Sequence, residues 1–182
     1  MKSHKITSHI IGRNVISLYG GPGSGKSTTA SGLFHLMKLA KIPCELVLEY
    51  AKDMTYSKRQ EEMSDQIYIF AKQNKRIEDI HRYDPNIIVI TDSPIKLGVF
   101  YGKDKPYVEE LNELILAVHN TRNNTDILIN RVKTYNPSGR NQTEEESNSI
   151  QRFLEKTFSY DLKIDGDENA PQKILDYVQK ML

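Results

Sequence analysis

The stretch that decides the fold is Gly20-Gly21-Pro22-Gly23-Ser24-Gly25-Lys26-Ser27. It matches the pattern G-x-x-x-x-G-K-[ST] in full, with a β-branched run at residues 14–19 before it and apolar residues at helical spacing after it. A strand, a glycine-rich loop and a helix N-terminus together present consecutive backbone N–H groups and a positive dipole end to an anion. The pattern therefore predicts a phosphate-binding loop. The full motif in this setting disfavours the alternative, an ordinary glycine-rich turn.

Each residue of the loop has a predicted role toward a nucleoside triphosphate, taken here as ATP with Mg²⁺. Lys26 is expected to reach the β- and γ-phosphates, and the Ser27 hydroxyl is expected to ligate Mg²⁺. Thr28 either donates to the α-phosphate or is an ordinary residue of the first helical turn. The residues predicted to bind the triphosphate through this loop are Gly21, Pro22, Gly23, Ser24, Gly25, Lys26, Ser27 and Thr28.

Short β-branched runs alternate with longer helical patterns along the chain. This alternation is typical of an α/β architecture of three layers, a parallel sheet with crossover helices on both faces. Nothing marks a second domain, so residues 1–182 are predicted to form one domain. Thr143 and Glu146 form a capping-box pattern that predicts a helix start. The predicted strands cover residues 14–19, 44–49, 87–90, 126–130 and 162–164, and the predicted helices begin at 26, 57, 106, 143 and 170, with the second ending at 83.

Two carboxylates follow predicted strands and are candidate catalytic residues. In open α/β sheets, ligands bind at the carboxyl ends of the strands. Glu49 ends the second strand and Asp92 follows the third, a buried hydrophobic run typical of a Walker-B segment. One of them is expected to hold Mg²⁺ together with Ser27, and Asp92 is the better candidate. The alternative interpretations are that Glu49 is a surface residue at the strand end and that Asp92 is a helix N-cap.

Two further segments follow the fourth and fifth strands. Residues 131–142 form a basic loop punctuated by Pro137 and Gly139, and Arg131 and Arg140 are predicted to close over the transferring phosphate as a lid. The alternative is a solvated surface loop. Gly166 follows the fifth strand, where a residue without a side chain would let the backbone lie against an adenine ring. A plain turn accounts for it equally well.

Composition narrows the function classes. Of 182 residues, 38% are hydrophobic and 27% are charged, and 25 Lys plus Arg against 24 Asp plus Glu leave a net charge of +1. This balance provides no global field for gripping a nucleic-acid backbone. The single cysteine, Cys44, excludes an internal disulfide and is expected in the core of a protein from a reducing cytoplasm. No apolar run predicts a membrane span, and the first residues lack a signal-peptide pattern.

The loop at Gly20–Ser27, the stretch Glu49-Tyr50-Ala51-Lys52, the end Thr91-Asp92-Ser93-Pro94 and the loop 131–142 resemble one known family. They resemble small P-loop kinases of the nucleoside and nucleotide kinase superfamily, in the branch with the ribosylnicotinamide kinase domain and small AAA-like ATPases, many of them phage-encoded. The resemblance implies a five-stranded parallel sheet ordered 2-3-1-4-5. Lys52 and Ser93 stand where relatives carry arginine, so Arg131 and Arg140 become the candidates for the guanidinium at the transferred phosphate.

These observations predict an ATP-dependent phosphotransferase that moves the γ-phosphoryl group to a nucleoside, a nucleotide or a nucleoside-like acceptor. Two alternatives stay open: a kinase of hydroxymethylated pyrimidines in phage DNA, and a P-loop ATPase that acts as a switch or on a protein partner. A small-molecule substrate is expected, with DNA as a further candidate and no membrane partner. The sequence predicts a cytoplasmic protein, located in the host cytoplasm if it is phage-encoded. It leaves open whether the protein is a monomer or a homodimer, and which of Glu49 and Asp92 is the base.

Overall fold

The computed structural model describes residues 12–57, 59, 62, 64–137 and 142–181. Its centre is a five-stranded sheet in the order β2-β3-β1-β4-β5, and every neighbouring pair of strands is parallel. This confirms the predicted strand order and the α/β class. The strands are β1 Asn14–Tyr19, β2 Cys44–Val47, β3 Ile88–Thr91, β4 Asn123–Asn130 and β5 Leu162–Asp165.

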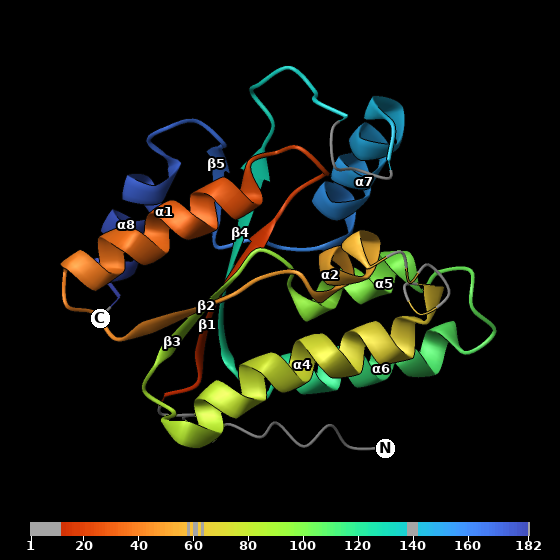
Figure 1. Cartoon of the computed structure of the whole chain (residues 1–182), viewed down its shortest axis with the longest axis horizontal. Coiled ribbons are helices and arrows are strands. Elements are labelled where there is room, and N and C mark those ends of the chain that lie inside the picture. The colour runs from red at the N-terminus through yellow and green to blue at the C-terminus, as the bar shows by residue number, and fades with distance from the viewer. Residues whose placement is uncertain (1–11, 58, 60–61, 63, 138–141, 182) are drawn as a thin grey trace.

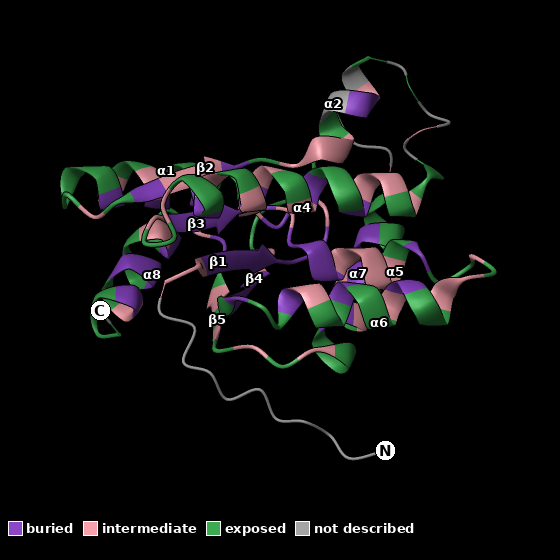
Figure 2. Cartoon of the chain, turned by 90° about the horizontal axis from the view of Figure 1, so that it is seen from below, coloured by how far each residue is buried: buried purple, intermediate pink, exposed green. Residues whose placement is uncertain are grey.

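Helices cover both faces of the sheet, as Figure 1 shows, with α1 and α8 on one side and α4 and α6 on the other. The sheet lies buried between these layers, while the outward faces of the helices are exposed (Figure 2). Parallel strands need such crossovers, because the chain must return to the same end of the sheet before the next strand begins. The helices are α1 Lys26–Leu39, α2 Tyr50–Tyr56, α4 Gln66–Tyr83, η1 Ile95–Leu97, α5 Gly98–Tyr101, α6 Val108–His119, α7 Glu144–Thr157 and α8 Ala170–Gln179. In the described part of the chain, no helix combines the length and apolar character that crossing a membrane requires.

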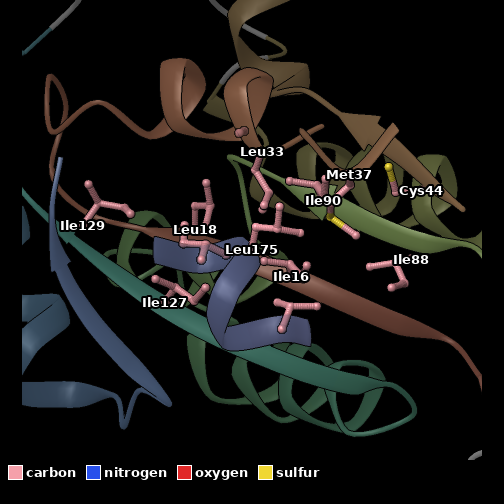
Figure 3. Close-up of a cluster of buried hydrophobic side chains, with 13 residues drawn as sticks. Ile16, Leu18, Leu33, Met37, Cys44, Ile88, Ile90, Ile127, Ile129 and Leu175 are labelled. Atoms are coloured by element: carbon pink, nitrogen blue, oxygen red, sulfur yellow. The ribbon is translucent and has the colours of Figure 1, made fainter. Parts of the chain in front are cut away.

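The core is divided by the sheet into two layers. Ile16 and Leu18 of β1 pack in the cluster that α1 and α8 cover, whereas Val15 packs in the cluster that α4 and α6 cover. This alternation follows from the period of two along a strand. Cys44 is buried in the first cluster, as expected from the sequence, and Figure 3 shows it among the aliphatic side chains there.

The structure corrects several predicted boundaries. The predicted helix 57–83 does not begin at 57, because the Asp65 side chain accepts a hydrogen bond from the Tyr68 N–H at 3.0 Å and caps α4 there. A separate helix, α2, precedes it. β4 begins at Asn123 rather than residue 126, because its polar first residues pair through the backbone with β1, a contact that hydrophobic periodicity does not detect.

Thr143 begins α7 through the capping box that the sequence predicts. The Thr143 hydroxyl accepts a hydrogen bond from the Glu146 N–H at 3.2 Å, and the Glu146 carboxylate accepts one from the Thr143 N–H at 2.7 Å. These reciprocal bonds satisfy backbone donors that the first turn leaves without helical partners. The start of the helix that follows the predicted lid is therefore fixed locally.

A buried ion pair joins η1 to β4. The Lys96 ammonium lies 2.7 Å from the Asp126 carboxylate, and it also lies 4.8 Å from the ring centre of Phe158 and 5.5 Å from that of Tyr19. Burial raises the pKa of Asp126, and the Lys96 charge opposes that rise. The nearby His119 ring has its pKa lowered to about 4 by burial and by neighbouring cations, so it is neutral at pH 7. Lys96 is therefore the cation that balances Asp126.

We expect Lys96→Ala to lower the free energy of unfolding by roughly 3–5 kcal/mol, because the substitution leaves the Asp126 carboxylate buried without its cation. The double variant Lys96→Met/Asp126→Leu should regain most of that stability, since it removes both charges. Urea unfolding measures both effects. Lys75→Ala, which breaks an exposed pair with Asp79, is the control and should change stability little. A single variant at Lys96 as stable as the parent would contradict the interpretation.

Candidate active site

The loop between β1 and α1 has the left-handed backbone that its glycines permit. Gly20, Gly23 and Gly25 have φ values of 148°, 81° and 97°, which residues with side chains seldom adopt. Lys26, the first residue of α1, folds back over the loop, and its ammonium donates to the carbonyl oxygens of Gly20 at 2.7 Å and Gly21 at 3.2 Å. The loop therefore curls around the lysine head group, in the place where the sequence predicts the β- and γ-phosphates.

Ser27 and Asp92 meet at the carboxyl edge of the sheet. The Ser27 hydroxyl donates to Asp92 Oδ2 at 2.5 Å, and the other carboxylate oxygen of Asp92 is buried with no hydrogen-bond partner among the described residues. Asp92 is only 4% exposed. Both oxygens are hard ligands of the kind Mg²⁺ prefers, and Mg²⁺ typically takes one or two protein oxygens with the remainder from phosphates and water. Within the described residues, no group of three or more His, Cys, Asp or Glu side chains is placed to hold a metal ion.

One cavity of about 520 Å³ connects the loop with the other strand ends. Glu49, after β2, lines it together with Lys26, Ser27 and Asp92. Burial, and to a smaller extent the charge of Glu49, raise the pKa of Tyr101 to about 12. The Glu49 carboxylate is therefore close to the Tyr101 phenol. The remaining lining residues are Gly20, Pro22, Gly23, Gly25, Thr28, Ala51, Lys52, Thr55, Gln66, Ile69, Phe70, Gln73, Ser93, Pro94, Ile95, Leu97, Gly98, Tyr101, Gln142 and Ile150.

Arg131 lies outside this cavity in the structure. Its guanidinium donates to Asn148 at 2.5 Å, pairs with Glu144 at 3.0 Å and lies over the Tyr135 ring at 5.1 Å. It lines a second hollow of about 400 Å³ beside Gly21. The structure therefore does not bring Arg131 to Lys26, Glu49 and Asp92. Arg140, the other predicted lid arginine, lies outside the described residues, as do residues 138–141 as a whole.

Helix α7 contacts the phosphate loop directly, which the sequence did not indicate. The Gly21 N–H donates to the Gln151 side chain at 2.7 Å, and the Ser147 hydroxyl donates to the Pro22 carbonyl at 2.7 Å. A Cβ on Gly21 would lie 2.6 Å from the Ser147 carbonyl oxygen, so this glycine is required by packing. In this structure the Gly21 N–H is thus bonded to protein. Ser147 and Gln151 stand four residues apart on one helix face, a spacing that was the only sequence signal available.

Gly166 lies against the phosphate loop itself. Its N–H donates to the Asn130 carbonyl at 2.8 Å, and a Cβ at this position would overlap the Ser24 carbonyl oxygen and lie 2.9 Å from the Ile129 side chain. The sequence predicted an approach of this backbone to an adenine ring, which stays a prediction; the contact that the structure shows is with the loop backbone. Ser24 is itself 3% exposed, buried under this contact.

Gln73 of α4 supports the wall of the cavity. Its side-chain oxygen accepts from the Tyr50 N–H at 3.0 Å, and its amide nitrogen donates to the Leu48 carbonyl and to the Thr91 hydroxyl, both at 3.4 Å. It therefore ties the segment around Glu49 to the end of β3. No motif in the sequence singled out this role.

The fold and the site define a P-loop nucleotide-binding class of protein. A family model described as an AAA domain matches residues 15–161. The chain therefore belongs to that AAA domain family. No curated protein matches the sequence.

The solved structures that are similar to this chain are distant in sequence. Shikimate kinase from Aquifex aeolicus superposes with a TM-score of 0.51 at 18% identity, over 91% of this chain and 96% of that one. The APS kinase CysC of Mycobacterium tuberculosis, in complex with AMPPNP and APS, is similar with a TM-score of 0.49 at 13% identity, over 92% of this chain and 98% of that one. Because the identity is only 18%, the similarity to shikimate kinase establishes the fold alone.

We expect Gly166→Ala to lower the free energy of unfolding by about 1–3 kcal/mol and to weaken binding of a non-hydrolysable ATP analogue, because the new methyl group displaces the Ser24 backbone. Thermal unfolding and calorimetric titration measure the two effects. The exposed neighbour Glu168 provides the control, and Glu168→Ala should leave both values unchanged. Unaltered analogue binding by Gly166→Ala would refute the role given to this contact.

Proposed function

We propose that the protein is an ATP-dependent phosphotransferase that moves the γ-phosphoryl group of ATP to a nucleoside-like acceptor. The observation that carries this proposal is the arrangement of Lys26, the Ser27–Asp92 pair and Glu49 around one cavity. A phosphate cradle alone fits any P-loop protein. A second carboxylate in the same cavity adds a base for an attacking hydroxyl.

The donor side uses the loop and its lysine. Lys26 lies where it would contact the β- and γ-phosphates once these replace the carbonyl oxygens that now hold it. Ser27 and Asp92 would hold Mg²⁺, which would neutralise part of the phosphate charge when bound. Asp92 is engaged by the Ser27 hydroxyl, so Glu49 is the residue that takes the proton from the acceptor.

The charge developing on the transferred group needs a further cation. Arg131 and Arg140 are the proposed sources, from the segment 131–142. Arg131 is held by Asn148 and Glu144 on α7, so reaching the phosphates requires it to leave these partners. Closure of the segment over the cavity would also exclude water from the reaction.

Two alternatives keep specific support. A P-loop ATPase acting as a switch fits the loop equally well, but Thr91 and Ser93 flank Asp92, where a water-activating glutamate would be expected. The second alternative, a kinase of hydroxymethylated pyrimidines in phage DNA, fits the family resemblance and would use the same donor side. A ribosylnicotinamide-type substrate also fits the resemblance and is one of the nucleoside-like acceptors of the main proposal.

The test is a transfer screen with ATP labelled at the γ-phosphate, across nucleosides, nucleotides, ribosylnicotinamide and DNA containing hydroxymethylated pyrimidines. We expect label in one acceptor class and little ADP formation when the acceptor is omitted. Added EDTA should stop transfer, because the Ser27–Asp92 pair acts through a divalent cation. Steady ATP hydrolysis with no labelled acceptor would instead establish the ATPase alternative.

Lys26→Ala should lower the transfer rate by about 10²–10³-fold, because it removes a charge that stabilises the transferring phosphate. Lys41→Ala, an exposed lysine just beyond α1, is the matched control and should keep the parental rate. Rates are measured at saturating acceptor. Equal rates for Lys26→Ala and the parent would exclude this loop as the donor site.

A further inference from the structure

Beyond the phosphate loop, the described cavity lining has fewer positive than negative side chains. This does not suit a phosphorylated acceptor. Outside the loop, the described lining contains one cation, Lys52, and two carboxylates, Glu49 and Asp92. No described arginine lines the cavity. A phosphate monoester carries close to two negative charges at pH 7, and burying it without matching cations is costly.

The rest of the lining contains apolar as well as neutral polar side chains. Phe70 and Ile69 of α4 face the cavity from one element, and Ile95 faces it from η1. Phe70 is 8% exposed and Ile95 is 6% exposed, so both belong to the packed wall and change position little when a ligand enters. Such a wall suits a flat ring that buries its apolar faces. Pro94, Leu97 and Ile150 extend it.

Gln73 bonds to Tyr50, Leu48 and Thr91, so it supports the wall. Gln66 and Tyr101 are among the other neutral polar side chains that line the cavity, and both types can hydrogen-bond a ring or a hydroxyl group. Burial and Glu49 raise the pKa of Tyr101 to about 12, so its phenol keeps its proton at pH 7.

The fate of the acceptor's proton also favours an acceptor without a phosphate. When a hydroxyl attacks, a bond forms between the acceptor oxygen and the γ-phosphorus, the bond from the γ-phosphorus to the β–γ bridging oxygen breaks, and ADP leaves. The hydroxyl proton must go to a base, here the Glu49 carboxylate. A phosphate acceptor is already ionised at pH 7, needs no base and would be repelled by Glu49.

We propose that the acceptor is a ring-bearing alcohol that carries no phosphate, so the enzyme performs a first phosphorylation and not the extension of an existing phosphate. This inference rests on the proposed kinase function and narrows its acceptor. Phe70 and its apolar neighbours hold the ring, and Glu49 takes the hydroxyl proton. Lys52, the one cation that the described lining has outside the loop, does not match the charge of a phosphate on the acceptor.

The experiment compares each common nucleoside with its 5′-monophosphate, both as acceptors of labelled γ-phosphate and as ligands of the protein holding a non-hydrolysable ATP analogue. We expect at least about tenfold preference for a nucleoside over its monophosphate in rate and in binding, equivalent to about 1.4 kcal/mol. Preference for a monophosphate would overturn the acceptor class while leaving the kinase intact. Nucleoside binding without any transfer would overturn the kinase while supporting the cavity chemistry.

A duplex containing hydroxymethyluracil is included in the same screen. Labelling of that duplex without labelling of the free hydroxymethyl nucleoside would also overturn the proposal, because the acceptor would then be recognised through its phosphates. Labelling of the free nucleoside at least as fast as the duplex supports it.

A charge-gain variant tests the reason for the preference. Gln66→Arg places a guanidinium in the cavity wall and should shift the ratio of nucleoside to monophosphate rates toward the monophosphate by about tenfold. Gln179→Arg makes the same change on the exposed face of α8 and should leave the ratio at the parental value. An unchanged ratio in Gln66→Arg, with the fold intact by circular dichroism, would refute the charge argument.

Discussion

The hydrogen bond from Ser27 to Asp92 is the contact on which the site depends. Ser27 lies in the first turn of α1, after β1, and Asp92 follows β3, so the two residues are far apart in sequence. They meet because β1 and β3 are parallel neighbours with Ser17 opposite Thr91, which brings both strand ends to one edge. A strand order that did not make β3 a neighbour of β1 would separate the loop from Asp92. The β1–β3 pairing is therefore required by the site as well as by the fold.

The phosphate loop is held from two other sides as well. Gly166 lies against Ser24, and Gln151 and Ser147 of α7 bond to the loop backbone. A loop fixed by β3, by the turn after β5 and by α7 has few conformations to lose when a phosphate binds, which favours affinity through pre-organisation. The same contacts connect the loop to the segment before α7, because Thr143 caps that helix immediately after residues 131–142.

The sequence predicted those parts of the structure that local rules determine. The strand order came from the family resemblance, the capping box at Thr143 followed from its spacing, and the meeting of Ser27 with Asp92 followed from the rule that strand ends share an edge. The position of Arg131 did not follow, because a long side chain is placed by distant partners, here Asn148 and Glu144. The start of α4 was missed for a different, local reason: the Asp65 cap begins the helix inside a longer helical pattern.

The buried Lys96–Asp126 pair explains how a wall of the cavity keeps its place. η1 carries Ile95 and Leu97 into the cavity, and between them Lys96 reaches the other way, to β4. Apolar side chains of equal volume would fill the same space, but dispersion contacts have little directionality and would leave the rotation of this single short turn poorly defined. An ammonium 2.7 Å from a carboxylate allows few orientations, so the pair fixes which residues of η1 face the cavity. Desolvating the two charges costs free energy, and this cost arises beside the cavity, where a small rotation of η1 would change the shape of the wall.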